Sequence, residues 1–122
     1  MSVVDATEPR AVDQPRVDAA RARMIPADEV QRLTELFRLL GDPTRVRILY
    51  ALFEVGELCV SDLATVVDAP ETSVSHALRL LRASGVVRHR KNGRMVHYSL
   101  DDAHVRVLLD VSAEHLRHEP RA

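Results

Sequence analysis

Residues 61–84, SDLATVVDAPETSVSHALRLLRAS, decide the fold. Two short helical patterns flank Asp68-Ala69-Pro70, a combination that predicts a tight turn. The second pattern runs from Thr72 to Ser84 and repeats apolar residues on one face, at Val74, Ala77, Leu78 and Leu81. Two short helices joined by a tight turn have the outline of a helix-turn-helix, whose second helix reads DNA.

A β-hairpin is predicted directly after this unit. The apolar period changes from 3.6 to 2 in VVRHR (86–90) and MVHYS (95–99), which flank Lys91-Asn92-Gly93-Arg94. Asn-Gly between two such runs is a strong hairpin signal, because both turn residues need positive φ. After a helix-turn-helix, a basic hairpin of this kind is a wing.

Helices are predicted on both sides of this unit. Residues 26–40 have apolar residues at helical spacing, a second helix begins near Thr44 and ends at Gly56, and residues 102–118 form a long last helix. The predicted fold class is mainly α with a small β-hairpin (α+β), a dimeric winged helix-turn-helix. We expect one DNA-binding and dimerisation domain over residues 25–119.

Residues 1–24 predict a flexible N-terminal tail, although Val17 to Met24 also suit a helix. The whole chain of 122 residues, 46% hydrophobic and 29% charged, fits one globular domain. No apolar run reaches the roughly 18 residues of a membrane span, and there is one cysteine, Cys59. These features predict a cytoplasmic protein that has no membrane partner.

Charge is distributed unevenly along the chain. The net charge of −1 argues against nucleic-acid binding, yet residues 73–99 hold six of the seventeen basic residues and no acidic one. Chance clustering on a solvated face is the alternative. We predict that double-stranded operator DNA is the partner. The predicted contacts are Thr72, Ser73, Ser75, His76 and Arg79 on the reading helix, and Arg88, Arg90, Lys91 and Arg94 on the wing.

The last helix carries four candidate metal ligands, Asp102, His104, His115 and His118. At 100° per residue the three imidazoles share one narrow sector of the helix, but His104 and His115 are about 16 Å apart along its axis. One metal ion, with bonds near 2 Å, cannot be reached from both ends. The residues therefore form two half-sites, Asp102/His104 and His115/His118.

An antiparallel pair of these helices would complete both half-sites. Asp102 and His104 of one copy would meet His115 and His118 of the other, which gives two four-ligand sites per dimer. Three imidazoles and one carboxylate suit Zn(II), and Co(II) can replace it. The alternative is that these are solvent-facing polar residues near a chain end. Surplus apolar residues on the first and last helices also predict a homodimer, which would match a palindromic operator.

Several motifs, in this order, resemble the ArsR/SmtB family of bacterial metal-sensing repressors: ELFRLLGDPTRVRILYAL, ELCVSDLA, SVSHALRLLRASGVV, RKNGRMVHYSL and DDAHVRVLL…HLRH. The resemblance covers roughly residues 27–119. It implies a dimeric repressor that releases operator DNA when a metal, commonly zinc, binds. Asp102-x-His104 and His115-x-x-His118 match the family's C-terminal-helix site in its three-histidine version.

Other family sites match less well. A nickel/cobalt sensor type uses the same four positions plus N-terminal ligands, and this tail has no histidine, so Ni(II) is an alternative effector. The arsenic-type Cys-x-Cys is reduced to Cys59-Val60-Ser61. The resemblance also implies that His115 contacts the backbone near His76 through its second ring N–H.

Two rival functions remain to be distinguished. A zinc hydrolase needs an open coordination position and a general base, and four protein ligands would close this site. We therefore predict that the chain is not an enzyme and has no small-molecule substrate. The stronger rival is a repressor of the same fold that senses no metal.

Overall fold

A computed structural model describes residues 10–118, and contacts divide the chain into two units, Met1–Leu33 and Thr34–Ala122. In the first, α2 (Gln14–Ala22) begins at Asp13, whose side chain accepts a hydrogen bond from the Arg16 N–H, and it buries no residue. The predicted tail thus contains a helix. Residues 1–9 of the predicted tail and residue 119, the last residue of the predicted domain, lie outside the described residues.

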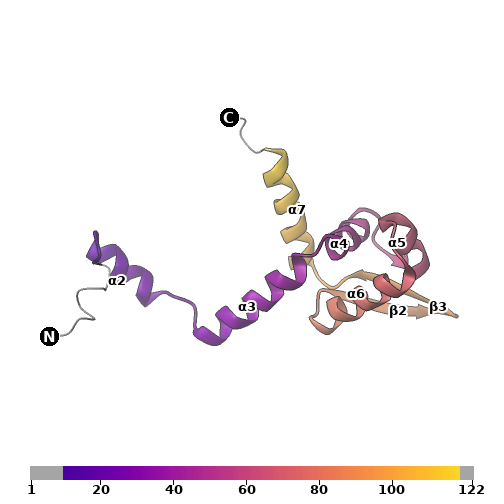
Figure 1. Cartoon of the computed structure of the whole chain (residues 1–122), viewed down its shortest axis with the longest axis horizontal. Helices are drawn as coiled ribbons and strands as arrows, with labels where there is room; N and C mark the ends of the chain where they lie inside the picture. The colour runs from indigo at the N-terminus through magenta and orange to yellow at the C-terminus, as the bar shows by residue number, and fades with distance from the viewer. Residues whose placement is uncertain (1–9, 119–122) are drawn as a thin grey trace. The chain divides into compact units, whose positions relative to one another are not determined.

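The second unit begins within α3 (Ala27–Leu40) and contains the predicted helix-turn-helix (Figure 1). The helix-turn-helix consists of α5 (Val60–Val67) and α6 (Glu71–Ala83), and α4 (Pro43–Val55) precedes it. Asp42 caps α4 by accepting a hydrogen bond from the Arg45 N–H at 3.1 Å, so α4 begins one residue before the predicted start. Gly56, at φ 91°, ends it.

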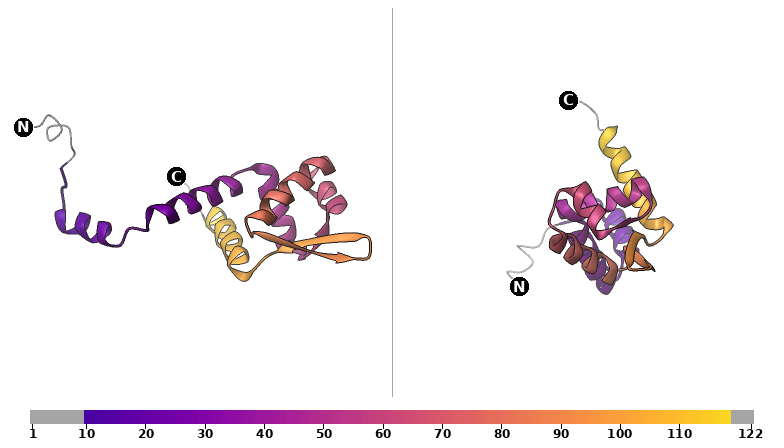
Figure 2. Two further views of the ribbon diagram at one scale, coloured as in Figure 1. Left: turned by 90° about the horizontal axis from the view of Figure 1, so that it is seen from below. Right: turned by 90° about the vertical axis from the view of Figure 1, so that its right-hand side faces the viewer.

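The predicted wing is present as β2 (Val87–Asn92) and β3 (Met95–Leu100). The expected Asn92-Gly93 turn is wrong by one residue: Asn92 is the last residue of β2 and pairs with Met95, so the turn is Gly93-Arg94, and only Gly93 has a positive φ, of 67°. Figure 2 shows these strands as a long, narrow ribbon beside the helices. A third strand, β1 (Leu58–Cys59), pairs antiparallel with β3 and gives the order β1-β3-β2. The sequence did not predict β1, because two residues are too few to show a period of 2.

One apolar core holds together the helix-turn-helix, α4 and the wing, which we call the reading unit. Its fully buried side chains come from α4, α5, α6 and β2: Ile48, Leu49, Leu52, Leu63, Val74, Leu78, Leu81 and Val87. The last helix, α7 (Ala103–Arg117), packs on α4 and β3 but buries only Leu109. None of the described helices is both long and apolar enough to cross a membrane. The mainly α fold with a small antiparallel sheet agrees with the predicted fold class.

Candidate DNA-binding and metal-binding sites

Helix α6 presents most of the predicted reading residues to solvent. Its core face is fixed by Val74, Ala77, Leu78 and Leu81, all buried. Packing of that face orients the opposite one, where Thr72, Ser73, His76 and Arg79 are exposed and Ser75 is half-buried. At the start of the helix, the Ser61 hydroxyl donates a hydrogen bond to a carboxylate oxygen of Glu71 at 3.3 Å, which links α5 to α6.

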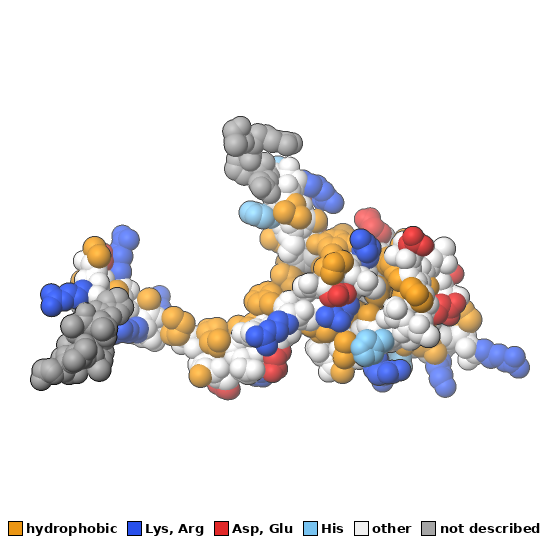
Figure 3. Space-filling model, viewed as in Figure 1, with side chains coloured by type: hydrophobic (Ala, Val, Ile, Leu, Met, Phe, Trp, Pro, Cys, Tyr) orange, Lys and Arg blue, Asp and Glu red, His pale blue; other side chains and the backbone are white. Residues whose placement is uncertain are grey.

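The wing carries its basic side chains on the exposed strands and the turn. Figure 3 shows Lys and Arg side chains gathered around the β2–β3 end of this unit. Arg88, Lys91 and Arg94 are exposed, and none of them forms a salt bridge among residues 10–118, although Arg88 is close enough to Glu57 for its charge to help lower the pKa of that carboxyl. They are therefore free to contact an anion such as a DNA phosphate.

Arg90 differs from the other wing cations because it is already paired. Its Nε donates to Oε2 of Glu57 and its Nη2 to Oε1, both at 2.7 Å. The hydrogen bond from Arg90 holds the pKa of the Glu57 carboxyl below its ordinary value and raises the pKa of the guanidinium. The sequence did not predict this pair, because the two residues are 33 positions apart and are brought together by the sheet.

At the start of α7 the structure brings Asp102 and His104 together. Oδ1 of Asp102 accepts a hydrogen bond from the Val105 N–H at 3.1 Å and caps the helix, while Oδ2 lies 3.7 Å from Nδ1 of His104. The bond from Val105 is the main cause that lowers the pKa of Asp102. The carboxylate is therefore ionised at neutral pH, as a metal ligand must be.

At the other end, His115 and His118 lie in the last turn of α7 and at its C-cap. Nδ1 of His118 lies 3.0 Å from a carboxylate oxygen of Glu114 and 3.2 Å from its backbone oxygen. These acceptors favour a proton on Nδ1 and leave the Nε2 lone pair available to a metal. The sequence analysis did not predict this contact, for which the i, i+4 spacing of Glu114 and His118 is the signal.

The structure keeps the two pairs apart along α7. Among residues 10–118, no three His, Cys, Asp or Glu side chains gather closely enough to hold a metal ion. Nor, within those residues, does any hydrogen bond join His115 to α6, so the contact with His76 that the family resemblance implies remains a prediction. One chain thus offers two half-sites of two candidate ligands each.

The histidine face of α7 also carries exposed apolar side chains. Val107, Leu108 and Val111 are 59%, 39% and 60% exposed. At 100° per residue they share a sector about 100° wide with the three histidines. Leu109, the buried residue of α7, lies outside this sector, on the side that faces α4. We call residues 104, 107, 108, 111, 115 and 118 the histidine face.

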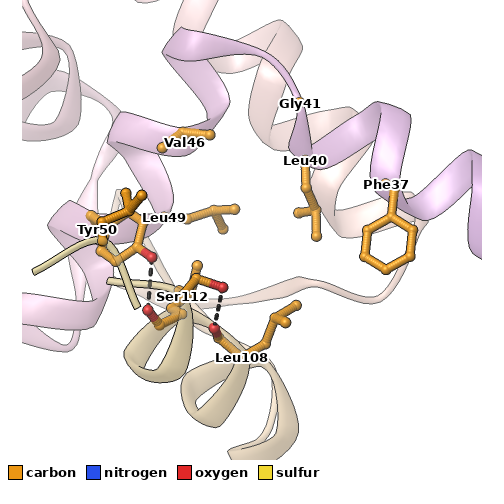
Figure 4. A pocket seen from close by; sticks show the side chains of 10 residues that line it. Phe37, Leu40, Gly41, Val46, Leu49, Tyr50, Leu108 and Ser112 are labelled. Carbon is orange, nitrogen blue, oxygen red and sulfur yellow. Dashed lines mark hydrogen bonds between the residues drawn. The ribbon is translucent and has the colours of Figure 1, made fainter. Parts of the chain in front are cut away.

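An apolar hollow of about 350 Å³ lies next to this face, between the end of α3, α4 and α7. Figure 4 shows Phe37 and Leu40 across from Leu108 and Ser112. Tyr50 borders the hollow from α4 and donates its hydroxyl proton to the backbone oxygen of Leu109 at 2.7 Å (Figure 4). The exposed ring of Phe37 extends the apolar surface beyond α7.

Cys59 is only 6% exposed and occupies the N-cap position of α5. It faces His97 in the register of β1 and β3. Because it is the chain's single cysteine, the protomer cannot form a site of several thiolates. Its burial is typical of a small apolar residue.

These features define a winged helix-turn-helix DNA-binding protein. The sequence matches, over residues 42–89, the family model described as bacterial regulatory protein, arsR family. The cadmium resistance transcriptional regulatory protein CadC homolog of Staphylococcus aureus is 38% identical over 116 residues, which cover 93% of each chain. The transcriptional repressor SmtB homolog of Synechocystis sp. is 42% identical over 110 residues, or 86% of this chain and 83% of that protein.

Among solved structures, the homodimeric winged helix-turn-helix DNA-binding domain of Mb0332 from Mycobacterium bovis is similar with a TM-score of 0.67. The identity is 27%, over 79% of this chain and 92% of that one. The chain belongs to the ArsR family of bacterial transcriptional regulators. This is a family of DNA-binding repressors, which confirms the predicted fold class and the prediction that the chain is not an enzyme.

Proposed function

We propose that this protein is a metal-responsive repressor that binds a palindromic operator as a homodimer and releases it when Zn(II) or Co(II) binds. The ligands are Asp102 and His104 of one copy together with His115 and His118 of the other. The observation that carries the proposal is the histidine face of α7, which has candidate ligands at both ends and exposed apolar side chains between them.

The spacing on α7 suits an antiparallel pair of these helices. Asp102 and His118 each lie eight residues from position 110, and His104 and His115 lie six and five residues from it. A two-fold axis near position 110 would therefore bring each half-site of one copy beside the complementary half-site of the other. It would also bury Leu108 and Val111 against their own copies, which removes apolar surface from water.

The donor set fits zinc. Three imidazoles and one ionised carboxylate are common Zn(II) ligands, and the free Nε2 of His118 and the lowered pKa of Asp102 suit that role. The relatives' names refer to cadmium and to a repressor, but a protomer with one buried cysteine lacks the thiolates that soft metals prefer. When bound, the metal would supply a cross-link between the two α7 helices. Ni(II) is the alternative effector.

For DNA, we propose that the exposed residues of α6 enter the major groove while the wing contacts the phosphate backbone. Thr72, Ser73, Ser75, His76 and Arg79 are the candidates for reading, and Arg88, Lys91 and Arg94 for phosphate contact. The exposure of all of these residues except the half-buried Ser75, and the absence of a salt bridge to the three wing cations among residues 10–118, support this division.

The chain's own contacts can connect the two sites. Tyr50 bonds the middle of α7, and Arg106 of α7 lies over the ring of Phe53 and donates to the Phe53 backbone oxygen. Both partners are on α4, which packs on α6 in the shared core. A change in α7 geometry would therefore reach the reading helix through α4, and by linkage operator DNA would weaken metal binding as much as metal weakens operator binding.

A subunit-mixing experiment tests this proposal. Asp102→Ala/His104→Ala chains are mixed with His115→Ala/His118→Ala chains, and zinc is titrated against a chromophoric chelator. Neither homodimer should bind zinc tightly. The heterodimer should regain one site, because its intact pairs face each other, and operator release should accompany it. A His89→Ala dimer is the control, since it removes an exposed histidine outside α7.

Two outcomes would count against the proposal. If verified subunit exchange restores no zinc site, the ligands are not shared across chains. If the unmodified dimer binds operator DNA equally well with zinc and with a chelator, the protein is the alternative, a repressor of the same fold that senses no metal.

A further inference from the structure

Arg90 occupies a wing strand but makes a bond that the other predicted phosphate contacts lack. Nε and Nη2, which form one edge of its guanidinium, each donate a hydrogen bond of 2.7 Å to a different carboxylate oxygen of Glu57. This is the bidentate geometry in which arginine–carboxylate pairs are strongest. A DNA phosphate would have to displace that carboxylate before it could bind Arg90 in the same way.

The pair spans the whole sheet. Arg90 of β2 lies opposite His97 of β3, and His97 lies opposite Cys59 of β1. Directly opposed residues project from the same side of an antiparallel sheet, and Glu57 is two positions before Cys59, which gives it the same direction. The bond therefore passes over the central strand and joins the outer wing strand to the chain just before β1.

That anchor point belongs to the helix-turn-helix. Cys59, the last residue of β1, is also the N-cap of α5, and α5 packs on α6. Glu57, which holds Arg90, thus immediately precedes β1, and β1 continues directly into α5, the first helix of the helix-turn-helix. The lowered pKa of Glu57 agrees with a carboxylate that stays charged and paired at neutral pH.

We infer that Arg90 is a positioning residue and not a phosphate contact: the Glu57–Arg90 pair sets the angle of the wing against α5. Arg88, Lys91 and Arg94 then reach the DNA backbone in register with the reading residues of α6. This inference concerns DNA binding alone and goes beyond the proposed metal response, since it holds whether or not the protein senses a metal.

The test measures operator affinity of the full-length dimer as a function of salt concentration. Each phosphate contact contributes about 0.9 to the slope of log K against log salt. Arg88→Met should reduce the magnitude of the slope by about 1.8 per dimer, because it removes one contact from each wing. Arg90→Met should leave the slope unchanged and weaken binding by about three- to ten-fold at all salt concentrations, as expected from losing two exposed ion pairs.

A charge swap gives the decisive comparison. In Glu57→Arg/Arg90→Glu the pair is rebuilt with the same net charge, so affinity should return to within about two-fold of the unmodified protein. A swap variant that binds as weakly as Arg90→Met, or an Arg90→Met slope reduced as in Arg88→Met, would overturn the inference. Because both side chains are at the surface, thermal unfolding should confirm that every variant remains folded.

Discussion

The reading face on α6 and the wing differs from the histidine face on α7 in how each is supported. The reading residues lie on elements that share one core, with Leu78, Leu81 and Val87 fully buried beneath them. Helix α7 buries only Leu109, while Val107 and Val111 remain well exposed. The proposed reading surface is therefore supported by a core within one chain, whereas residues 10–118 leave the proposed dimer and metal surface on α7 uncovered.

This difference separates what each kind of substitution should affect. Changes on α7 should act on metal binding and dimerisation and leave the packed reading unit intact. Changes on α6 or the wing should act on DNA binding without altering the metal site. The predictions below test that separation, and those with the largest expected effects come first.

The largest effect is expected for the metal ligands. His104→Ala or His118→Ala should weaken zinc binding by about two to three powers of ten, because four ligands share a binding free energy on the order of 10–16 kcal/mol. Operator affinity without metal should stay within about two-fold, since neither side chain touches α6 or the wing. Competition with a chelator and DNA-binding titrations measure the two effects. A metal-free variant that loses operator affinity would show that the regions are not separable.

A carboxylate at the centre of the histidine face should disrupt the dimer. Val111→Asp would place two like charges near the proposed two-fold axis and should weaken dimerisation by about 100-fold. Val55→Asp is the matched control, because Val55 of α4 is 64% exposed, similar to Val111 at 60%. Sedimentation velocity at a series of concentrations distinguishes them. If Val111→Asp remains as dimeric as Val55→Asp, the histidine face is not the interface.

On the reading face, a base contact and a phosphate contact should differ in kind. Arg79→Ala should cost about 1–3 kcal/mol and relax specificity at one operator position. Lys91→Met should instead weaken binding to all sequences and reduce the salt slope. Affinities for operators substituted at single positions separate the two. An Arg79→Ala variant with unchanged sequence preference would remove Arg79 from the reading set.

The two regions also differ in how far the sequence predicts them. The helix-turn-helix and the wing were predicted to within one or two residues, because Pro70 and Gly93 mark boundaries that depend on local backbone geometry. The exact turn was not predicted, since it is Gly93-Arg94 and not Asn92-Gly93. Strand β1 and the Glu57–Arg90 pair were not predicted, since they depend on contacts between distant parts of the chain. The spacing of apolar residues along the chain predicts local secondary structure and not such long-range contacts.

For the candidate metal site, the sequence predicted the two half-sites from helical spacing alone, and α7 has the length and start that this spacing requires. Neither the link to α4 through Tyr50 nor the Glu114 contact with His118 was predicted. Tyr50 is 59 positions from Leu109, and only the folded chain brings them together. The contacts that could transmit a signal are thus the part that sequence patterns leave out.

That link predicts a smaller effect on stability and on coupling. Tyr50→Phe removes the hydrogen bond to Leu109 and should cost about 1 kcal/mol of unfolding free energy. If metal binds as proposed, the ratio of operator affinities without and with zinc should also fall, while zinc affinity stays nearly unchanged. Ser112→Ala is the matched control, because its hydroxyl bonds Leu108 within the same helix. Urea unfolding and operator titrations measure both, and equal behaviour of the two variants would contradict a role for Tyr50 in transmission.

The smallest effect concerns how pH acts on the Glu57–Arg90 ion pair that joins the wing to the chain before β1. Because the pKa of Glu57 is below its ordinary 4.5 in the folded protein, the charged carboxylate stabilises the fold at neutral pH. That contribution is complete above about pH 4.5 and is lost as the pH falls through the lowered pKa. Glu57→Gln should therefore unfold at slightly lower urea than the unmodified protein at pH 7, and the difference should shrink below pH 4.5. Glu54→Gln, which removes an exposed carboxylate of α4, should show no such convergence. If the Glu57→Gln difference is the same at pH 7 and pH 4, the charge of Glu57 does not hold the wing, and only the shape of its side chain does.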